Sequence, residues 1–120
     1  MKKTLLLLAI LAMSLPALAG LKEKPVIGTW TYKLDTGYEM LTGTIEFKKS
    51  DGKLLGEVNT DDGLFIEVTK VEIRDNNVLY FEVPVDGDIL QVSLTIDKKS
   101  YEGTVASSQG DVPITGEKKE

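Results

Sequence analysis

The chain contains no cysteine and no histidine among its 120 residues. Without cysteine there is no disulfide framework and no thiolate metal ligand, so a folded domain must be stabilised by packing alone. Without histidine, the most frequent general base and metal ligand is missing, and no side chain with an ordinary pKa changes charge near neutral pH. These absences argue against nucleophilic catalysis and against transition-metal sites.

Other routes to catalysis also lack support. A serine follows a lysine at Lys99-Ser100, but these residues belong to a turn sequence. Five glutamates fall on the solvent-facing phase of predicted strands, as solvated faces do: Glu46, Glu57, Glu67, Glu82 and Glu102. The acidic turns Asp61-Asp62 and Asp86-Gly87-Asp88 offer oxygen atoms, yet they match no calcium-loop spacing, and aspartate before glycine is ordinary turn chemistry. We therefore predict no enzyme, no cofactor and no metal site.

Long apolar runs are scarce, and the clearest one is N-terminal. Lys2 and Lys3 precede an apolar centre, and Pro16 precedes the small residues of Ala17-Leu18-Ala19. This order is typical of a secretory signal. We predict a signal peptide at residues 1–19 and one domain at residues 20–120, in a periplasmic or secreted protein. The apolar run is short for a membrane span, so no span is expected after cleavage, a retained anchor being the alternative.

The charge balance is acidic, with 14 basic and 19 acidic residues and a formal net charge of −5. Cleavage would remove two lysines and no acid, which leaves the domain more acidic still. An acidic surface argues against nucleic acid and against anionic membranes as partners.

What the chain does contain is a repeated pattern of apolar residue, any residue, glycine, any residue, apolar residue. It occurs at 26–30, 41–45, 54–58 and 101–105, and at 114–118 with a lysine in the last position. In a strand, the glycine and the two apolar residues share the buried face. Because glycine weakens a strand unless space or bending requires it, the pattern predicts a strongly curved antiparallel sheet.

Turn sequences separate eight segments of alternating character. They lie at 35–37, 50–52, 61–63, 75–77, 86–88, 98–100 and 108–110. The fold class is therefore predicted as all-β: a single-domain, eight-stranded antiparallel up-and-down barrel whose last strand pairs with its first. The glycine segments would form one wall, and strands four to six a bulkier one. A change of phase near Thr69-Lys70 predicts a bulge in strand four.

Gly28-Thr29-Trp30 on the first strand resembles the Gly-x-Trp signature of the lipocalin and avidin superfamily, the calycins. The resemblance implies a lipocalin-like barrel in which a basic residue of the closing strand packs across the tryptophan. Lys118 matches that position, with Lys119 as the alternative. Leu41-Thr42-Gly43-Thr44 is also similar to the second avidin strand, but the polar biotin-binding positions are not recognisable after Trp30. The chain is similar to compact lipocalin-like domains of small secreted bacterial proteins.

Two functions follow as hypotheses, because an eight-stranded barrel is either just filled by side chains or holds one small ligand. The first is non-catalytic binding of a small apolar ligand inside the barrel. Its predicted lining residues are Trp30, Tyr32, Phe47, Phe81 and Tyr101. The second is a protein-interaction module with a filled core, which would use an outward patch of Leu55, Phe65 and Tyr80. Trp30 itself is either a core plug or a pocket wall.

Overall fold

The computed structural model describes residues 22–119 of the chain. The predicted signal peptide at residues 1–19 lies outside the described residues. Within the described part, no helix has the length and apolar character needed to cross a membrane.

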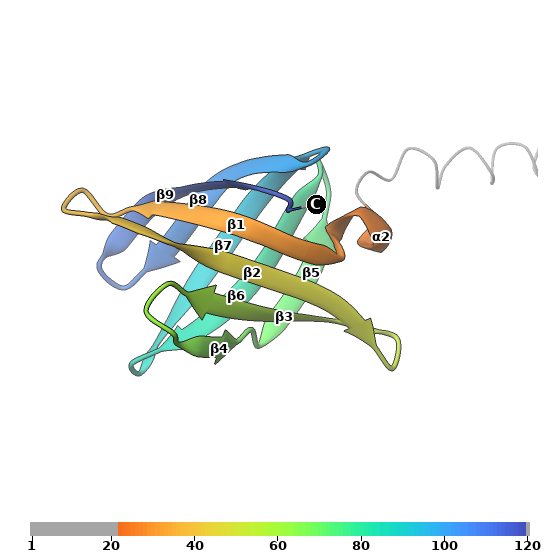
Figure 1. The fold of residues 1–120 in the computed structure, drawn as a ribbon, viewed down its shortest axis with the longest axis horizontal. Helices are drawn as coiled ribbons and strands as arrows, with labels where there is room; N and C mark the ends of the chain where they lie inside the picture. Colours follow the sequence, from red (N-terminus) through yellow and green to blue (C-terminus); the bar gives the residue numbers. More distant parts are fainter. Residues whose placement is uncertain (1–21, 120) are drawn as a thin grey trace, which may run out of the picture.

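Residues 22–119 form nine strands and one short helix (Figure 1). They are α2 (Glu23–Val26), β1 (Gly28–Asp35), β2 (Met40–Ser50), β3 (Lys53–Thr60), β4 (Phe65–Glu67), β5 (Lys70–Arg74), β6 (Val78–Val85), β7 (Asp88–Asp97), β8 (Ser100–Ser107) and β9 (Gly110–Glu117). All strands belong to one sheet in the order β4-β3-β2-β1-β9-β8-β7-β6-β5. Every pairing is antiparallel, and β9 pairs with β1 as predicted, so the sheet is an up-and-down, barrel-like structure.

The prediction of eight strands is wrong by one, at the position of the predicted bulge. The chain breaks at Val68-Thr69, so that β4 pairs with β3 while β5 pairs with β6. The Val68 amide donates to Gly56 at 2.9 Å, and the Thr69 amide donates to Glu82 at 2.9 Å. Consecutive residues thus hydrogen bond to opposite edges of the sheet, because one strand cannot follow both edges where they diverge. The sheet is curled rather than a fully closed eight-stranded barrel.

A second difference lies before β1. The first glycine segment, 26–30, is not strand throughout: Val26 ends α2, a single helical turn that also contains Pro25, and β1 begins at Gly28. Val26 is completely buried and packs in the core. A single turn is too short to produce a recognisable helical period, which explains why the sequence pattern did not predict it.

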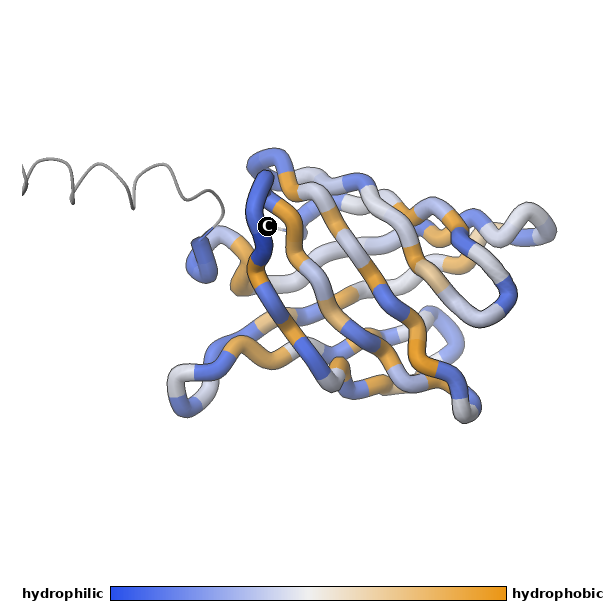
Figure 2. The backbone as a smooth tube through the Cα atoms, turned by 180° about the vertical axis from the view of Figure 1, so that it is seen from behind, coloured by the Kyte–Doolittle hydropathy of each residue, from blue (hydrophilic) through white to orange (hydrophobic). Residues whose placement is uncertain are grey.

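Hydrophobic and hydrophilic residues alternate along the strands (Figure 2). In β7, for example, Val92, Leu94 and Ile96 are buried while the residues between them are more exposed. The core collects the inward side chains of every long strand, and among the described residues no polar or charged residue is fully buried. Stability therefore rests on apolar packing, as the lack of cysteine requires.

Three of the five inward glycines accommodate aromatic rings of neighbouring strands. Three rings lie opposite glycines in register: Tyr32 opposite Gly43, Phe47 opposite Gly56, and Tyr101 opposite Gly116. A Cβ at Gly56 would lie 2.9 Å from the Phe47 ring, and one at Gly116 would lie 2.7 Å from the Tyr101 ring. The glycine strands β3, β2, β1, β9 and β8 are neighbours, as predicted. The other two inward glycines adjoin no ring: Gly28 faces the Lys118 side chain, and Gly103 faces the backbone of β7.

Candidate functional site

The interior of the barrel is divided into a filled half and a hollow half. We call the end that carries α2 and the β2–β3, β5–β6 and β7–β8 turns the closed end. The opposite end, with the β1–β2, β3–β4, β6–β7 and β8–β9 turns, is the open end. The division matters because an eight- or nine-stranded barrel has room either for side chains or for one small ligand.

Trp30 plugs the closed half. It is 1% exposed, its indole N–H donates to the Val26 carbonyl at 2.9 Å, and its ring meets the Tyr101 ring edge-on at 5.9 Å. The Lys118 amine lies 5.7 Å from the centre of the indole and donates to the Pro25 carbonyl at 3.0 Å. The position that the calycin resemblance implied for Lys118 is thus confirmed. The indole, α2 and the last strand seal this end together.

Tyr101 belongs to the same plug. Its hydroxyl donates to the Thr31 carbonyl at 2.7 Å, which ties β8 to β1 across the intervening β9. Burial, and then the nearby Tyr32 hydroxyl, raises the pKa of Tyr101 well above its ordinary value of 10.0. The phenol is therefore neutral and serves as a structural donor.

The other half of the interior holds a cavity of about 230 Å³. Its walls are almost entirely aliphatic and aromatic, and its polar side chains are Tyr32 and Thr60. The lining consists of Tyr32, Leu34, Leu41, Ile45, Val58, Thr60, Leu64, Ile66, Phe81, Val83, Val85, Leu90, Val92, Val105 and Ile114. Leu41 and Leu64 are both lining and solvent-exposed, which places the mouth at the open end.

The five residues predicted to line a ligand pocket separate into two groups. Tyr32 and Phe81 line the cavity, whereas Trp30, Phe47 and Tyr101 do not. Phe47 packs edge-on against Phe81, with ring centres 5.5 Å apart. Phe81 therefore forms part of the boundary between the filled half and the hollow half.

Sequence reasoning missed most of the lining, because it selected aromatic residues and passed over aliphatic ones. Leu34, Leu41, Leu64, Val85 and Leu90 lie at strand ends beside the turns of the open end. Their position relative to the turns could have identified them. In an up-and-down barrel, every second turn lies at the same end, so the inward aliphatic residues beside those turns face one another there. The corresponding closed-end positions are covered by α2 and Trp30.

Apolar side chains are exposed around the mouth. Of the seven large hydrophobic residues that are exposed in the described part of the chain, six lie at the open end. They are Tyr38, Met40, Leu41, Leu64, Phe65 and Ile89, of which Tyr38 is 97% exposed and Phe65 74% exposed. Single exposed apolar residues are ordinary, but a set gathered at one opening is typical of a binding site.

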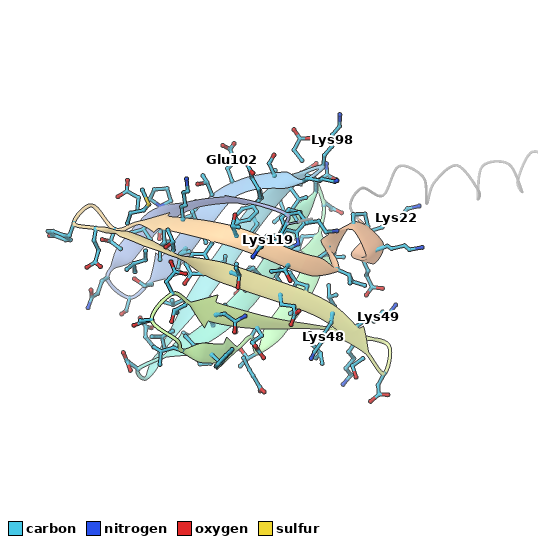
Figure 3. All side chains as sticks on the ribbon, in the orientation of Figure 1. Lys22, Lys48, Lys49, Lys98, Glu102 and Lys119 are labelled. Atoms are coloured by element: carbon cyan, nitrogen blue, oxygen red, sulfur yellow. The ribbon has the colours of Figure 1, made fainter. Side chains whose placement is uncertain are left out.

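Charge is distributed unevenly between the two ends. The open-end segments 35–40, 60–65, 85–88 and 107–110 contain six acidic residues and no basic one. The closed-end segments 22–27, 50–53, 74–78, 97–100 and 118–119 contain eight basic and four acidic residues. Figure 3 shows Lys22, Lys48, Lys49 and Lys98 at the closed end, near α2. The acidic residues of the open end are Asp35, Glu39, Asp61, Asp62, Asp86 and Asp88.

Hydrogen bonds hold four of these carboxylates in place, and Asp35 accepts one from the Gly37 amide at 3.0 Å. The hydroxyls of Thr42 and Thr60 donate to Asp61 and Asp62. The Ser108 hydroxyl donates to Asp88 at 2.9 Å, which joins the β8–β9 turn to the start of β7. This bond, with backbone donors from Ser108 and Ile89, holds the pKa of Asp88 below its ordinary value. In residues 22–119 no group of three or more potential ligand side chains is arranged to hold a metal ion.

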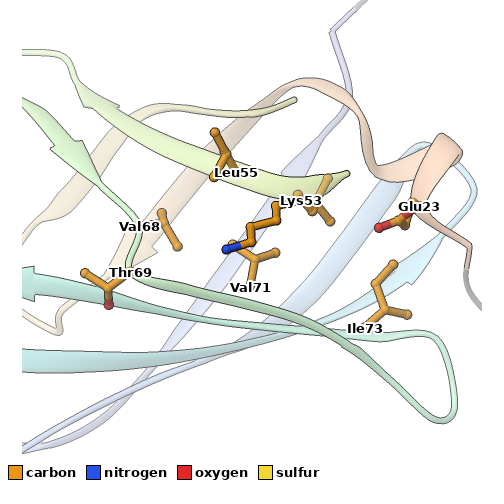
Figure 4. A pocket seen from close by; sticks show the side chains of 8 residues that line it. Glu23, Lys53, Leu55, Val68, Thr69, Val71 and Ile73 are labelled. Carbon is orange, nitrogen blue, oxygen red and sulfur yellow. The ribbon is translucent and has the colours of Figure 1, made fainter. Parts of the chain in front are cut away.

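A second cavity, of about 440 Å³, lies at the seam between β3 and β5 (Figure 4). Its lining consists of Glu23, Lys53, Leu54, Leu55, Val68, Thr69, Val71 and Ile73. β4 pairs with β3 only through Glu57 to Asn59, so within the described residues the first half of β3 and the outer edge of β5 have no strand partner. Lys53 extends over this gap, and a charged side chain of this kind protects an open sheet edge.

The predicted outward patch of Leu55, Phe65 and Tyr80 is wrong. Tyr80 is only 7% exposed, because the Arg74 guanidinium stacks 3.8 Å above its ring. The Tyr80 hydroxyl donates a hydrogen bond to the Glu82 carboxylate at 2.5 Å. Phe65 pairs with Asn59, four residues from Leu55 along β3, which separates the two side chains by roughly 13 Å. Leu55 lies at the seam and Phe65 at the open end, so the three residues form no common surface.

Comparison with known proteins supports the fold alone. No family model matches the chain, and no curated protein matches it. A redesigned β-barrel of known structure is similar with a TM-score of 0.63 at 17% identity, over 81% of this chain and 94% of the barrel. A de novo designed fluorescence-activating β-barrel is similar with a TM-score of 0.55 at 21% identity, over 78% and 93% of the two chains.

Proposed function

We propose that this chain is an exported, lipocalin-like, non-catalytic binding protein that takes a small apolar molecule into the hollow half of its barrel. The observation that carries the proposal is the apolar cavity of about 230 Å³ with its mouth at the open end. Pockets that bind small molecules are typically concave, mostly apolar and furnished with few polar groups. Tyr32 and Thr60 are the polar side chains of this one.

The division of the barrel supports a pre-formed site. Trp30, Phe47 and Tyr101 fill the closed half and are each 5% exposed or less, so the hollow half is not simply a loosely packed end of the core. A ligand entering a pre-formed pocket avoids the cost of ordering its walls. The N-terminal signal pattern supports export, and the sequence contains no histidine or cysteine to support catalysis.

The expected affinity is modest. An eight-carbon chain gains at most about 6 kcal/mol at ~0.8 kcal/mol per buried methylene, and lost translational and rotational freedom offsets several kcal/mol of this gain. We therefore expect a Kd of about 1 mM or weaker for 1-octanol.

The first experiment is a calorimetric titration of the folded protein with 1-octanol, carried out on the wild type and on two variants. Val83→Phe places a ring at a cavity-lining position that is 4% exposed, and we expect it to weaken octanol binding at least about tenfold by occupying the volume. Ile89→Phe is the control, because Ile89 lies at the same end but does not line the cavity.

Saturable octanol binding that Val83→Phe removes and Ile89→Phe leaves intact supports the carrier function. If the wild type binds no octanol, or if both variants bind as the wild type does, the cavity is not a ligand site. The filled-core interaction module would then be the better description of the protein.

A further inference from the structure

The polar groups at the cavity mouth favour a positively charged group on the ligand. Tyr32 is 7% exposed and lines the cavity, and no described residue hydrogen bonds its hydroxyl. Among the described residues the Tyr32 oxygen is not one of the fully buried unpartnered atoms, so it is accessible in the cavity and available to a ligand. In the sheet register Tyr32 lies opposite Gly43, and Gly43 lies opposite Thr60, which is followed at once by Asp61 and Asp62.

The electrostatic field at this position is negative. Burial first, and then the charges of Asp61 and Asp62, raises the pKa of Tyr32 above 10.0. These negative charges would repel a bound carboxylate and attract a bound ammonium group. The turn segments 35–40 and 60–65 contain no basic residue. Lys33 lies opposite Thr42 in the register, but the charges that act on Tyr32 are those of Asp61 and Asp62.

Two structural details keep the charges at the rim. The Thr42 and Thr60 hydroxyls donate to Asp61 and Asp62, which fixes the carboxylates at the β3–β4 turn, beside Leu64 of the lining. Across the mouth, the hydrogen bonds from Ser108 and Ile89 keep Asp88 ionised to a lower pH than usual. The apolar walls of the cavity would contact the chain of an amphiphile, and the carboxylates at the rim would contact its charged head group.

We propose that the cavity selects cationic amphiphiles: an apolar chain lies in the hollow half of the barrel, and an ammonium group lies at the mouth between the Tyr32 hydroxyl and the carboxylates of Asp61 and Asp62. This inference rests on the proposed function and assigns its ligand class. It excludes fatty acids and other anionic amphiphiles as preferred ligands. The ammonium group donates a hydrogen bond to the accessible Tyr32 oxygen.

The test compares three probes of equal chain length at pH 7: octylammonium, 1-octanol and octanoate. We expect octylammonium to bind about tenfold more tightly than octanoate at low salt, with octanol between them. The difference should shrink at about 0.5 M salt, because exposed carboxylates are screened. The double variant Asp61→Asn/Asp62→Asn should remove most of the difference between octylammonium and octanoate. Asp75→Asn, which removes a charge at the closed end, is the matched control.

The possible outcomes distinguish a failure of the proposed selectivity from a failure of the proposed carrier function. If octanol binds but octanoate binds as tightly as octylammonium, the cavity is a ligand site without the proposed selectivity. If the preference persists in Asp61→Asn/Asp62→Asn, those carboxylates are not its cause and the assignment is wrong. If none of the three probes binds, both the carrier function and its selectivity are overturned.

Discussion

At the scale of single residues, three glycines on the inner face, Gly43, Gly56 and Gly116, are positions where a neighbouring ring occupies the space of a missing side chain. Gly56 is the clearest example, because a Cβ there would meet only side chains: Phe47 at 2.9 Å and Val68 at 3.3 Å. The Phe47 ring is 1% exposed and cannot move aside into solvent. The pairing of a ring with a cross-strand glycine both fills the space and permits the sheet to curve.

Gly56→Ala should therefore lower the free energy of unfolding by about 1–3 kcal/mol through overpacking. The cost should fall below about 1 kcal/mol in a Phe47→Leu background, since the smaller side chain leaves room for the methyl group. Urea unfolding of the four proteins of this double-mutant cycle measures both values. An equal cost in the two backgrounds would show that the ring contact does not determine the need for glycine.

Trp30 and Tyr32 show how two neighbouring inward positions take different roles. Trp30 faces the closed half, where Val26 and Lys118 supply a carbonyl acceptor and a cation. Tyr32, two residues further along β1, faces the hollow half and keeps its hydroxyl unpartnered among the described residues. The boundary between core and cavity therefore crosses β1 between these two side chains.

At the scale of elements, the weak point of the fold is the seam between β3 and β5. Lys53 extends across the seam cavity, as Figure 4 shows, while Leu54, Val71 and Ile73 provide its apolar surface. Open edges of this kind invite pairing with another chain unless a charge opposes it. The lysine thus favours the monomer over edge-to-edge association.

Replacement of that charge should promote self-association. In Lys53→Ile the apolar seam loses its charged cover, so sedimentation velocity should detect dimers or larger species at concentrations where the wild type is monomeric. Lys33→Ile is the control, because Lys33 pairs with Thr42 of β2 on one side and with Thr115 of β9 on the other. A Lys53→Ile protein that sediments like Lys33→Ile would contradict the protective role of the lysine.

Elements with regular alternation were predictable from the sequence, and those without it were not. The turns after β2, β5 and β6 were marked by Asp-Gly or Asn-Asn, and Asp51, Asn76, Asn77 and Asp86 all have the positive φ that such turns require. The change of phase near Thr69 was also visible. Its consequence, a transfer of the chain from one sheet edge to the other, depends on how far apart β3 and β6 lie, which no local pattern encodes.

The same limit applies to the candidate site. The sequence placed Tyr32 and Phe81 on the inward face correctly, but it could not say which half of the barrel would be filled. That outcome depends on α2, whose single turn brings Val26 and the Pro25 carbonyl to Trp30 and Lys118. A tertiary contact between the two chain ends therefore decides where the hollow half lies.

At the scale of the whole molecule, the two ends of the barrel differ in packing, hydrophobicity and charge. The closed end is sealed and rich in lysine, and the open end is hollow, apolar and acidic. Such a charge separation orients an approaching ion before contact, and salt weakens the effect. A cationic amphiphile would thus be guided to the end where the cavity opens.

The central claim is that the hollow half accepts an apolar molecule while the filled half does not. The most direct measurement is the nuclear Overhauser contacts of bound 1-octanol in the folded, full-length protein. The account predicts contacts from the octyl chain to Phe81, Val83 and Leu90, and none to the Trp30 indole. Contacts to Trp30, or to the seam at Val71 and Ile73 instead of the cavity, would contradict it.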